Sequence, residues 1–540
     1  MAEAHRDHRV VVVGAGIGGL VSALLLAARG VEVTLVEAAA GPGGKMRQLQ
    51  VDGAAIDSGP TVFTMRWVFE QILAEAGGSM ADLPALTPLS VLARHAWKGH
   101  PLRLDLHADR ERSAAAIGGF AGAAEAKRFL GFCAEARRVY QALEGPYIRG
   151  PRPRLNSLAR DLGPRGLMTL AGLGPYGLPF ATMWQSLGRH FHDPRLRQLF
   201  ARYATYTGSS PWQAPATLML VAQVELDGVW SVDGGMHAVA QSFAALATRR
   251  GATLRYGAAC ERILVRNGRV RGVQLAGGEE IAADSVVFNG HPQALVDGLL
   301  GDKVTHAVPA LPPAKRSLSA LTWSAHTATA GFPLARHNVF FDDDYAGEFS
   351  DIFKHRTLPK AGTVYVCAQD RDDCRDRPKP GADAEGEGAG TPERLLCLVN
   401  APPDGDRRAF DTQETSRCEQ HSLALLRGCG LQIDWKPGQV QLTTPQDFNR
   451  LFPATGGALY GQATHGWMSS FQRPGTYTRV PGLYLAGGGV HPGPGVPMAA
   501  LSGQRAAATL LAHLDSTSRS RRVATSGGTS TPSATTAATR

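Results

Sequence analysis

The stretch VVVVGAGIGGLVSALLLAARGVEVTLVE, residues Val10–Glu37, decides the fold of this chain. Its hydrophobic pattern predicts, in order, a buried strand at 10–13, a glycine turn at 14–19, a helix at 20–29 and a second buried strand at 31–36. Two strands joined through a helix form a βαβ unit, which implies a parallel sheet with a right-handed crossover. The sequence therefore predicts an α/β fold built on a Rossmann-like parallel sheet.

The uncharged run at 10–28 is also long enough for a membrane span or a secretory signal. However, the run begins with valines, continues with spaced glycines and ends in a leucine-rich helix. This order is typical of a βαβ unit and is not required for a membrane span. No cleavage site with small residues follows the run. We therefore expect it to belong to a folded domain.

Gly14, Gly16 and Gly19 have the G-x-G-x-x-G spacing of a dinucleotide-binding turn, and Glu37 ends the next strand. The first glycine of such a turn permits the tight bend, the second lets the backbone approach a pyrophosphate, and the third allows close helix–strand packing. The helix N-terminus offers N–H groups to phosphate, and Glu37 would accept hydrogen bonds from the ribose hydroxyls. The alternative is a purely structural βαβ turn.

A second glycine cluster, GPGGK at 41–45, follows Glu37 closely. A nicotinamide cofactor gives no reason for this cluster, whereas an extended FAD must run past another close backbone turn to place its isoalloxazine end. The predicted cofactor is therefore FAD. The residues expected along its path are Gly44, Lys45 and the segment Asp57–Thr61, with Gly59, Pro60 and Thr61 as the candidate contacts.

A glycine-rich strand–turn–helix pattern returns near the end of the sequence, in YLAGGGVHPGPGVPMAALSG at Tyr484–Gly503. The first turn leaves the isoalloxazine end of FAD uncovered, so the second turn is predicted to close the site. The N-terminus of its helix would point at the O2 side of the flavin, where negative charge gathers on reduction. The candidate cofactor contacts here are Gly487, Gly488, His491, Gly495, Val496, Pro497 and Met498.

The composition is that of a globular protein with two or three domains, with 540 residues, 44% of them hydrophobic and 19% charged. The net charge of +9 suits an anionic membrane surface better than nucleic acid, because no nucleic-acid-binding motif is present. Seven scattered cysteines without a CxxC pair favour a reducing, cytoplasmic location and argue against structural zinc. No metal is predicted.

Changes of pattern along the chain predict a discontinuous domain organisation. The predicted parts are an FAD-binding domain at 1–85, 230–300 and 446–514, a substrate and membrane-associated region at 86–229 and 301–445, and a disordered tail at 515–540. The substrate region is expected to be α+β, with a mostly helical first part. Asn267-Gly268 signals a β-hairpin, and the charged, glycine-rich segment 372–391 a surface loop.

Several segments together resemble the bacterial-type phytoene desaturases, or carotenoid dehydrogenases, a family of flavoproteins. The resemblance spans about residues 9–512 and is carried by residues 11–46, DSGPTVFTM at 57–65, Tyr206–Met236, VYVCAQDRDD at 364–373 and the C-terminal turn. ATYTGSSPWQAPA and GVWSVDGGM most resemble the hydroxyneurosporene (methoxyneurosporene) 3,4-desaturases of spheroidene and spirilloxanthin biosynthesis.

The resemblance implies an FAD-dependent oxidoreductase that introduces a C-3,4 double bond into acyclic 1-hydroxy- or 1-methoxy-carotenoids. In this reaction the flavin accepts a hydride from a carbon beside the polyene, and loss of a neighbouring proton completes the double bond. A substrate with so few polar atoms requires a long apolar channel and few catalytic side chains. Without a second dinucleotide fingerprint, oxygen or a membrane quinone is the expected electron acceptor.

The same resemblance places an acidic residue near the channel, and Asp161 is the candidate for a group that accepts the proton or stabilises the cation. A helix-cap or surface aspartate is the alternative. His190 and His192 could suggest a metal pair, but residues two apart on a helix do not face each other, so we expect solvated histidines.

The segment Gly166–Trp184 contains no charge and follows the arginines at 149, 152, 154, 160 and 165. Its prolines and glycines make a spanning helix a poor fit. The sequence leaves two alternatives open: peripheral attachment of the segment to anionic lipid, or a buried helix of the substrate region.

Two other functions fit parts of the pattern. One is a flavoenzyme with another substrate, either a phytoene desaturase acting on phytoene or neurosporene, or an amine oxidase. The last cysteine, Cys429, lies well before the final glycine turn, so no cysteine stands where an amine oxidase would attach its flavin. The other is a non-catalytic lipid-binding protein similar to GDP-dissociation inhibitors, which needs no flavin.

Overall fold

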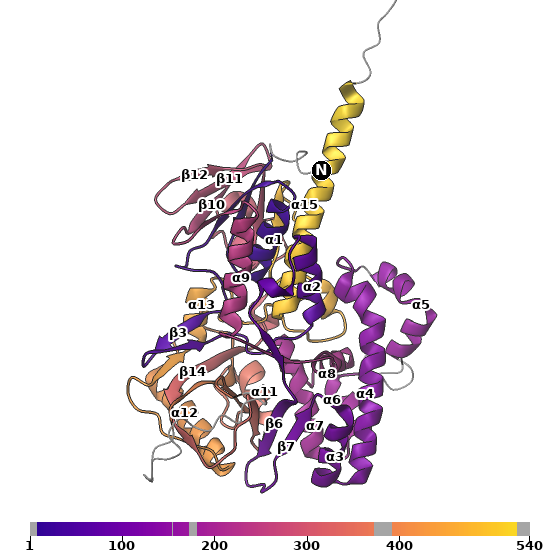
Figure 1. Cartoon of the computed structure of the whole chain (residues 1–540), viewed down its shortest axis with the longest axis vertical. Helices are drawn as coiled ribbons and strands as arrows, with labels where there is room; N and C mark the ends of the chain where they lie inside the picture. Colours follow the sequence, from indigo (N-terminus) through magenta and orange to yellow (C-terminus); the bar gives the residue numbers. More distant parts are fainter. Residues whose placement is uncertain (1–7, 154, 172–180, 372–390, 526–540) are drawn as a thin grey trace, which may run out of the picture.

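The computed structural model describes residues 8–153, 155–171, 181–371 and 391–525 (Figure 1). A parallel sheet lies in the upper part of Figure 1, a mixed sheet lies at the lower left and a helical layer lies at the lower right. The surface loop predicted at 372–391 falls almost entirely outside the described residues, as does the end of the predicted tail.

The parallel sheet contains the predicted βαβ unit. Its order is β21–β13–β1–β2–β9, and every neighbouring pair is parallel. The strands are β1 (Arg9–Val13), β2 (Glu32–Val36), β9 (Thr253–Arg255), β13 (Ser285–Phe288) and β21 (Leu483–Leu485). In β1, Val10 and Val12 pack into the core on one face and Val11 and Val13 into the core on the other. Burial on both faces explains why the strand is a continuous hydrophobic run.

Helices cover one face of the parallel sheet and a small antiparallel sheet covers the other. The helices are α1 (Ile17–Ala27), α9 (Met236–Arg249) and α15 (Val496–Thr525), and the small sheet contains β10 (Cys260–Arg266), β11 (Arg269–Leu275) and β12 (Glu280–Ala282). Between β10 and β11, Asn267 and Gly268 have φ values of 51° and 72°. Positive φ at both positions is what a two-residue hairpin requires, so the predicted hairpin is confirmed.

Helix α15 continues to Thr525, so the prediction of a disordered tail from residue 515 onwards is wrong for its first part. The buried residues Leu510 and Leu514 fix the earlier turns of the helix against the core. A helix that is already nucleated adds further turns easily, even where the sequence is rich in serine, threonine and arginine. Residues 526–540 lie outside the described residues.

The mixed sheet has seven strands in the order β20–β14–β18–β17–β16–β6–β7. The strands are β6 (Val91–Trp97), β7 (Leu104–His107), β14 (Ser319–Thr327), β16 (His337–Phe341), β17 (Val364–Ala368), β18 (Glu393–Ala401) and β20 (Val440–Thr443). Only β16 and β6 pair in parallel, and α12 (Thr412–Gly428) packs on one face of the sheet. The prediction of a mostly helical region from residue 86 missed β6 and β7. Strand β7 pairs with the adjacent β6, and β6 joins the rest of the sheet by pairing with β16, which is far along the chain.

The helical layer follows β7 and has an aromatic core in which Phe132, Phe191 and Phe200 contact one another. Its elements are α3 (Arg110–Ala121), α4 (Ala123–Leu143), the π-helix η2 (Glu144–Arg149), α5 (Leu155–Ala171), α6 (Met183–His190), α7 (Pro194–Ala201), the 3₁₀ turns η4 (Arg202–Thr207) and η5 (Ala216–Met219), and α8 (Leu220–Leu226). Helix α5 is kinked at Gly163, where φ is 62° and a proline follows.

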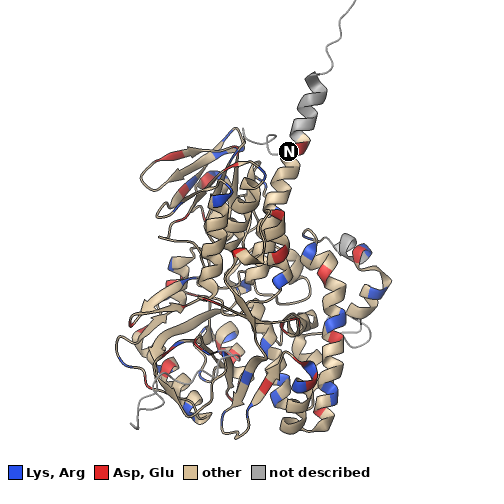
Figure 2. Ribbon diagram, in the orientation of Figure 1, with Lys and Arg blue, Asp and Glu red and all other residues tan. Residues whose placement is uncertain are grey.

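Shorter elements connect these layers. They include α2 (Arg66–Glu75), α10 (Gln293–Val296), α11 (Tyr345–Ser350), the π-helix η8 (Asp351–His355), α13 (Pro445–Leu451), α14 (Ser469–Gln472), and the strand pairs β3 (Gln48–Val51) with β4 (Ala54–Asp57), β5 (Leu86–Pro88) with β8 (Trp230–Val232), and β15 (Thr329–Ala330) with β19 (Gln432–Ile433). The helices within the described ranges are all too short or too polar to cross a membrane. Figure 2 shows residues of both charge signs in every layer.

Candidate cofactor and substrate cavity

A cavity of about 1080 Å³ begins at the carboxyl ends of the parallel strands and continues along one face of the mixed sheet. The carboxyl ends of parallel strands are where open α/β sheets bind ligands. Most of the predicted cofactor residues line this cavity, namely Gly14, Gly16, Glu37, Gly44, Lys45, Gly59, Pro60, Thr61, Gly487, Gly488, Gly495, Val496, Pro497 and Met498. Gly19 and His491 are not among the lining residues.

The first glycine turn is built by close contacts that leave no room for side chains. Gly14 has a φ of 102°, and its carbonyl accepts a hydrogen bond from Asn289 Nδ2 at 3.2 Å. A Cβ on Gly16 would lie 2.8 Å from that same nitrogen, and a Cβ on Gly19 would lie 2.0 Å from the Gly14 oxygen. Gly19 therefore has the packing role predicted for it, while Gly14 and Gly16 present bare backbone to the cavity.

Glu37 lies beside this turn, half-buried at the end of β2. Its carboxylate accepts hydrogen bonds from the backbone N–H groups of Ala15, at 2.6 Å, and Ala39, at 2.8 Å. These two bonds hold the carboxylate next to the N-terminus of α1, which is the position from which it can accept hydrogen bonds from a ribose.

The second glycine cluster lies against the first. A Cβ on Gly44 would lie 3.2 Å from Gly16 Cα, and a Cβ on Gly59 would lie 1.8 Å from the Lys45 oxygen. Asp57, which was expected along the cofactor path, instead accepts a hydrogen bond from Met236 N–H at the start of α9. It does not line the cavity, because a carboxylate at a helix N-terminus is held by the free N–H groups there.

Two cations in the cavity wall lack an acidic partner. Lys45 donates to the Leu459 carbonyl, and Arg473 donates to the carbonyls of Tyr460 and Gln462. Among the described residues neither cation forms an ion pair. Burial, and after it the charge of Arg473, lowers the pKa of Lys45 to about 8, and burial lowers the pKa of Arg473 to about 10. This part of the cavity therefore favours an anionic group.

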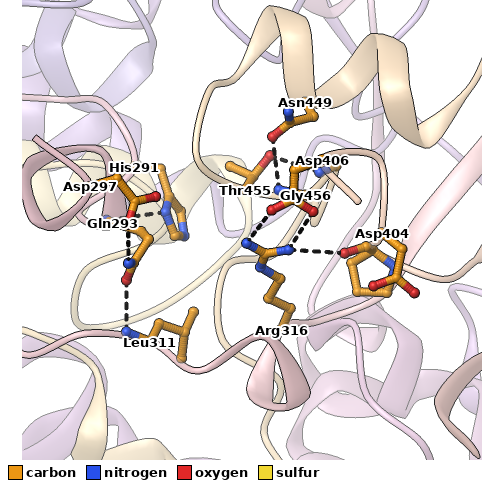
Figure 3. Close-up of polar contacts among 12 residues, drawn as sticks. His291, Gln293, Asp297, Leu311, Arg316, Asp404, Asp406, Asn449, Thr455 and Gly456 are labelled. Carbon is orange, nitrogen blue, oxygen red and sulfur yellow. Dashed lines mark hydrogen bonds and ion pairs between the residues drawn. The ribbon is translucent and has the colours of Figure 1, made fainter. Parts of the chain in front are cut away.

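His291 belongs to the same part of the wall and is neutral at physiological pH. Burial, followed by the charges of Lys45, Arg316 and Arg473, lowers its pKa to about 3. In Figure 3, the Gln293 N–H donates to His291 Nδ1 at 3.3 Å, and Arg316 binds both carboxylate oxygens of Asp406, at 2.8 and 2.7 Å. A Cβ on Gly456 would lie 2.1 Å from Nη1 of the same guanidinium, so only glycine fits there, next to the cavity residue Thr455.

The C-terminal turn meets the first turn because α15 crosses α1 at very short range. A Cβ on Gly503 would lie 2.2 Å from the Gly18 oxygen, and a Cβ on Gly18 would lie 2.8 Å from Gly487 N. Ser22 Oγ donates to the Gly503 carbonyl at 3.1 Å. Glycine at the crossing thus brings the turn that precedes α15 alongside the first glycine turn, and both turns border the one cavity.

His491 has a different environment from the one predicted. Its buried ring packs edge-on against Tyr147, with ring centroids 4.9 Å apart, and its Nε2 lies 3.4 Å from the Gly150 oxygen. The neighbouring Pro492 lines the cavity and His491 does not. The turn directs the imidazole towards η2, so His491 supports the turn and does not contact the cofactor space.

Away from the glycine turns the wall is mostly apolar and comes from α5, α8 and the mixed sheet. Leu396, Leu398 and Asn400 alternate along β18 towards the cavity, as a strand with one face on a cavity requires. The polar exceptions were not identified from the sequence. They include Arg202, Tyr206, Glu225, Tyr345 and Glu348. Three of them lie within or beside the conspicuous segment Tyr206–Met236, but Tyr345 and Glu348 carry no recognisable motif.

Asp161 is exposed on α5 and does not line the cavity. Besides Glu37, the carboxylates that do so among the described residues are Glu225 and Glu348. Leu162, the neighbour of Asp161, does line the cavity, so Asp161 stands beside the channel wall with its side chain exposed, and its role as a proton acceptor stays a prediction. His190 pairs with Glu135 at 3.3 Å, and the described residues contain no cluster able to hold a metal ion.

The residues at the glycine turns fit FAD. Bare glycine backbone borders the cavity at both turns, a fixed carboxylate stands at the ribose position, and two cations lack acidic partners. In addition, the buried Asn289 Oδ1 has no hydrogen-bond partner among the described residues and lies between the two turns, beside Gly18 and Gly487. The glycine turns and Glu37 would hold the dinucleotide, and Lys45 with Arg473 would neutralise its negative charge.

Comparison with known proteins agrees with this geometry. The sequence model of the family described as flavin containing amine oxidoreductase matches residues 17–511. The chain is 68% identical to the hydroxyneurosporene desaturase of Rubrivivax gelatinosus, over 99% of both chains. It is 44% identical to the hydroxyneurosporene desaturase of Cereibacter sphaeroides, over 95% of this chain and 99% of that one. The crystal structure of an oxidoreductase from Methanosarcina mazei covers 92% of this chain with a TM-score of 0.55 at 16% identity, which shows a shared fold.

The substitution Gly488→Ala tests the glycine wall of the cavity. A Cβ at this position meets nothing closer than 3.7 Å, so the protein should fold normally, yet the methyl group occupies space that bare backbone leaves to FAD. We expect FAD affinity, measured by titration of the apoprotein, to fall about tenfold. Gly41→Ala is the matched control, because Gly41 does not line the cavity and its Cβ meets nothing within 4 Å. Equal affinity in both variants would contradict the assignment.

The pKa of Lys45 predicts how FAD affinity depends on pH. A bound anion favours the protonated lysine, so above a pKa of about 8 binding must take up a proton. Affinity should therefore fall as the pH rises from 8 to 10, by at most about tenfold per pH unit. Lys45→Met should bind FAD more weakly at pH 7 and show a flatter profile in the same titration. A variant profile as steep as that of the natural chain would refute a role for Lys45.

Proposed function

Because the chain belongs to the flavin-containing amine oxidoreductase family, we propose that it is an FAD-dependent carotenoid 3,4-desaturase acting on acyclic 1-hydroxy- or 1-methoxy-carotenoids. The observation that carries this proposal is the high identity to hydroxyneurosporene desaturases over nearly the whole chain, which includes every wall of the cavity. A lipid-binding protein without flavin would need neither the two glycine turns nor the unpaired cations beside them.

When bound, FAD supplies an oxidant that accepts a hydride from the carbon beside the polyene. The contribution of the chain is to bind the polyene and to exclude water from the reacting carbons. Apolar side chains of α5, α8 and β18, such as Leu170, Val221 and Leu398, line the space next to the cofactor turns. Contact with a wall of this kind stabilises a hydrocarbon along its length without requiring polar atoms.

We also propose that oxygen or a membrane quinone takes up the electrons afterwards. The support is the sequence, in which a single G-x-G-x-x-G unit stands at a strand–helix turn. Reoxidation of the reduced enzyme by a soluble quinone under argon, compared with reoxidation in air, separates these two acceptors.

The substrate is extracted from a bilayer, and α5 is the element we propose for peripheral attachment. Leu167 and Met168 on α5 are 45% and 68% exposed, and Leu167 also lines the cavity. The exposed side chains of Arg160 and Arg165 flank them on the same helix. Apolar residues beside basic ones suit the surface of an anionic bilayer. Part of the segment predicted for this role, residues 172–180, lies outside the described residues.

The substrate assignment predicts a conditional product in cells. The chain should be expressed in cells that make neurosporene, with and without a carotenoid 1,2-hydratase. We expect the carotenoid absorption to shift to longer wavelength only when the hydratase is present, because only then does the oxygen at carbon 1 exist. Conversion of phytoene in cells lacking the hydratase would support the phytoene desaturase alternative instead.

The attachment proposal predicts that a charge on α5 weakens binding to membranes. Met168→Glu should lower the fraction of protein that sediments with vesicles of phosphatidylglycerol and phosphatidylcholine, by about thirtyfold in partition coefficient, because a buried methionine contributes about 2 kcal/mol. Leu102→Glu is the matched control, since Leu102 is 50% exposed in the connection between β6 and β7. If both variants sediment equally, α5 is not the attachment site.

A further inference from the structure

One part of the apolar cavity wall carries buried hydrogen-bond donors that have no acceptor. Arg202, at the start of η4, donates from Nη1 to the Tyr206 hydroxyl at 3.1 Å, but its Nε and Nη2 have no partner among the described residues. The hydroxyl of Tyr345 on α11 also has none. Both side chains line the cavity and are only 8% exposed. Buried polar groups are normally paired, so these donors indicate a ligand.

The charge of Arg202 is already balanced within the wall. Glu225 on α8 accepts hydrogen bonds from Tyr203, at 2.6 Å, and from Tyr206, the residue that Arg202 contacts. Burial disfavours the charge of Arg202, but the nearby Tyr206 and Glu225 outweigh burial and raise its pKa above the ordinary value. A cation and an anion in one cluster leave no net charge. The missing ligand is therefore a neutral acceptor and not an anion.

Both free groups remain donors at physiological pH. Burial, and after it the charge of Glu348, raises the pKa of Tyr345 well above its ordinary value, so its hydroxyl keeps the proton. Arg202 and Tyr345 both line this one cavity, and the charge of Arg202 acts on the Tyr345 hydroxyl, so the two donors border a shared space. A hydroxyl oxygen and an ether oxygen can both accept hydrogen bonds from such donors.

The donors are connected to the segment that is expected beside the flavin. Thr61 Oγ1 lies 2.7 Å from the Tyr365 hydroxyl, and that hydroxyl lies 2.7 Å from His337 Nδ1. This chain of contacts runs from the cofactor turn at 59–61 across β17 to β16.

In addition, η4, which carries Arg202, is capped by Gly208, where a Cβ would lie 2.6 Å from the ring of the cavity residue Tyr460. The Tyr460 carbonyl accepts a hydrogen bond from Arg473 in the cofactor wall, so η4 adjoins that wall. A ligand oxygen bound beside Arg202 lies near the reacting end of the cavity.

That position matches the chemistry of the proposed substrate. An oxygen on carbon 1 is separated from carbon 3 by three covalent bonds of about 1.5 Å each, so it lies within about 4 Å of the bond to be oxidised. Any group that binds this oxygen must therefore stand next to the cofactor and not at the distant end of the channel.

We propose that Arg202 and Tyr345 form an oxygen-binding subsite that holds the hydroxyl or methoxyl group at carbon 1 of the carotenoid. The inference rests on the proposed function and adds the residues that select the substrate. A carotenoid without this oxygen leaves two buried donors unsatisfied, which is an effective means of rejection. Two hydrogen-bond donors also explain why the site would bind carotenoids with either a hydroxyl or a methoxyl group, since both groups carry an acceptor oxygen.

The test is a competition for the FAD-loaded enzyme. Equimolar 1-hydroxyneurosporene and neurosporene are offered in detergent micelles, and the ratio of the two bound carotenoids is measured by chromatography. We expect the natural chain to prefer the hydroxylated carotenoid at least about 100-fold. Tyr345→Phe, which removes no hydrogen bond to any described residue, should reduce this preference about tenfold, and Arg202→Met should reduce it further. The rate of flavin bleaching by each carotenoid under argon should change in the same ratio.

Tyr140→Phe is the matched control, because Tyr140 is a buried tyrosine that does not line the cavity. In this variant the ratio of bound 1-hydroxyneurosporene to bound neurosporene should equal that of the natural chain. A loss of stability would lower binding of both carotenoids and leave their ratio unchanged, so the ratio isolates the subsite. An unchanged ratio in Tyr345→Phe and Arg202→Met, or no preference in the natural chain, overturns the subsite. If neither carotenoid bleaches the flavin of the natural chain, the proposed function itself fails.

Discussion

The contact between α1 and α15 is the constraint on which the site depends. Gly18 and Gly503 let the two backbones approach until no side chain fits between them, and Ser22 ties the helices with a hydrogen bond to the Gly503 carbonyl. Because both helices start at the cavity, this crossing brings the two glycine turns side by side, so that both border one space. With a larger residue at the crossing the helices would separate, and the two halves of the cofactor wall would separate with them.

The parts of this arrangement that the sequence predicts are those with local causes. The βαβ unit follows from continuous hydrophobic runs, and the hairpin at Asn267-Gly268 from two residues that tolerate positive φ. The C-terminal turn was placed correctly at the cavity because its pattern is a strand, glycines and a helix. The secondary structure that was not predicted depends on pairing between strands that are distant in the sequence. Strand β6 joins the mixed sheet through β16, and no local signal records that partner.

The direction of side chains is the other feature that the sequence does not predict. The sequence predicts His491 as a cofactor contact and Asp57 as a residue along the cofactor path, yet the backbone turns them towards Tyr147 and the start of α9. Asp161 was proposed on position alone and lies exposed on α5. Conversely, Arg202 and Tyr345 are far apart in the sequence and neither belongs to a motif. Only the fold shows that both border the same cavity.

The closeness of Gly18 to Gly503 also sets an order of events during synthesis. The first glycine turn leaves the ribosome early, but the strand β21 and the helix that complete its binding site are among the last segments to be made. Contacts of such high sequence separation form late and slow the folding of a chain. Until then, the nascent chain holds the N-terminal half of a nucleotide site without the means to close it, so we expect the cofactor to be captured only after translation is nearly complete.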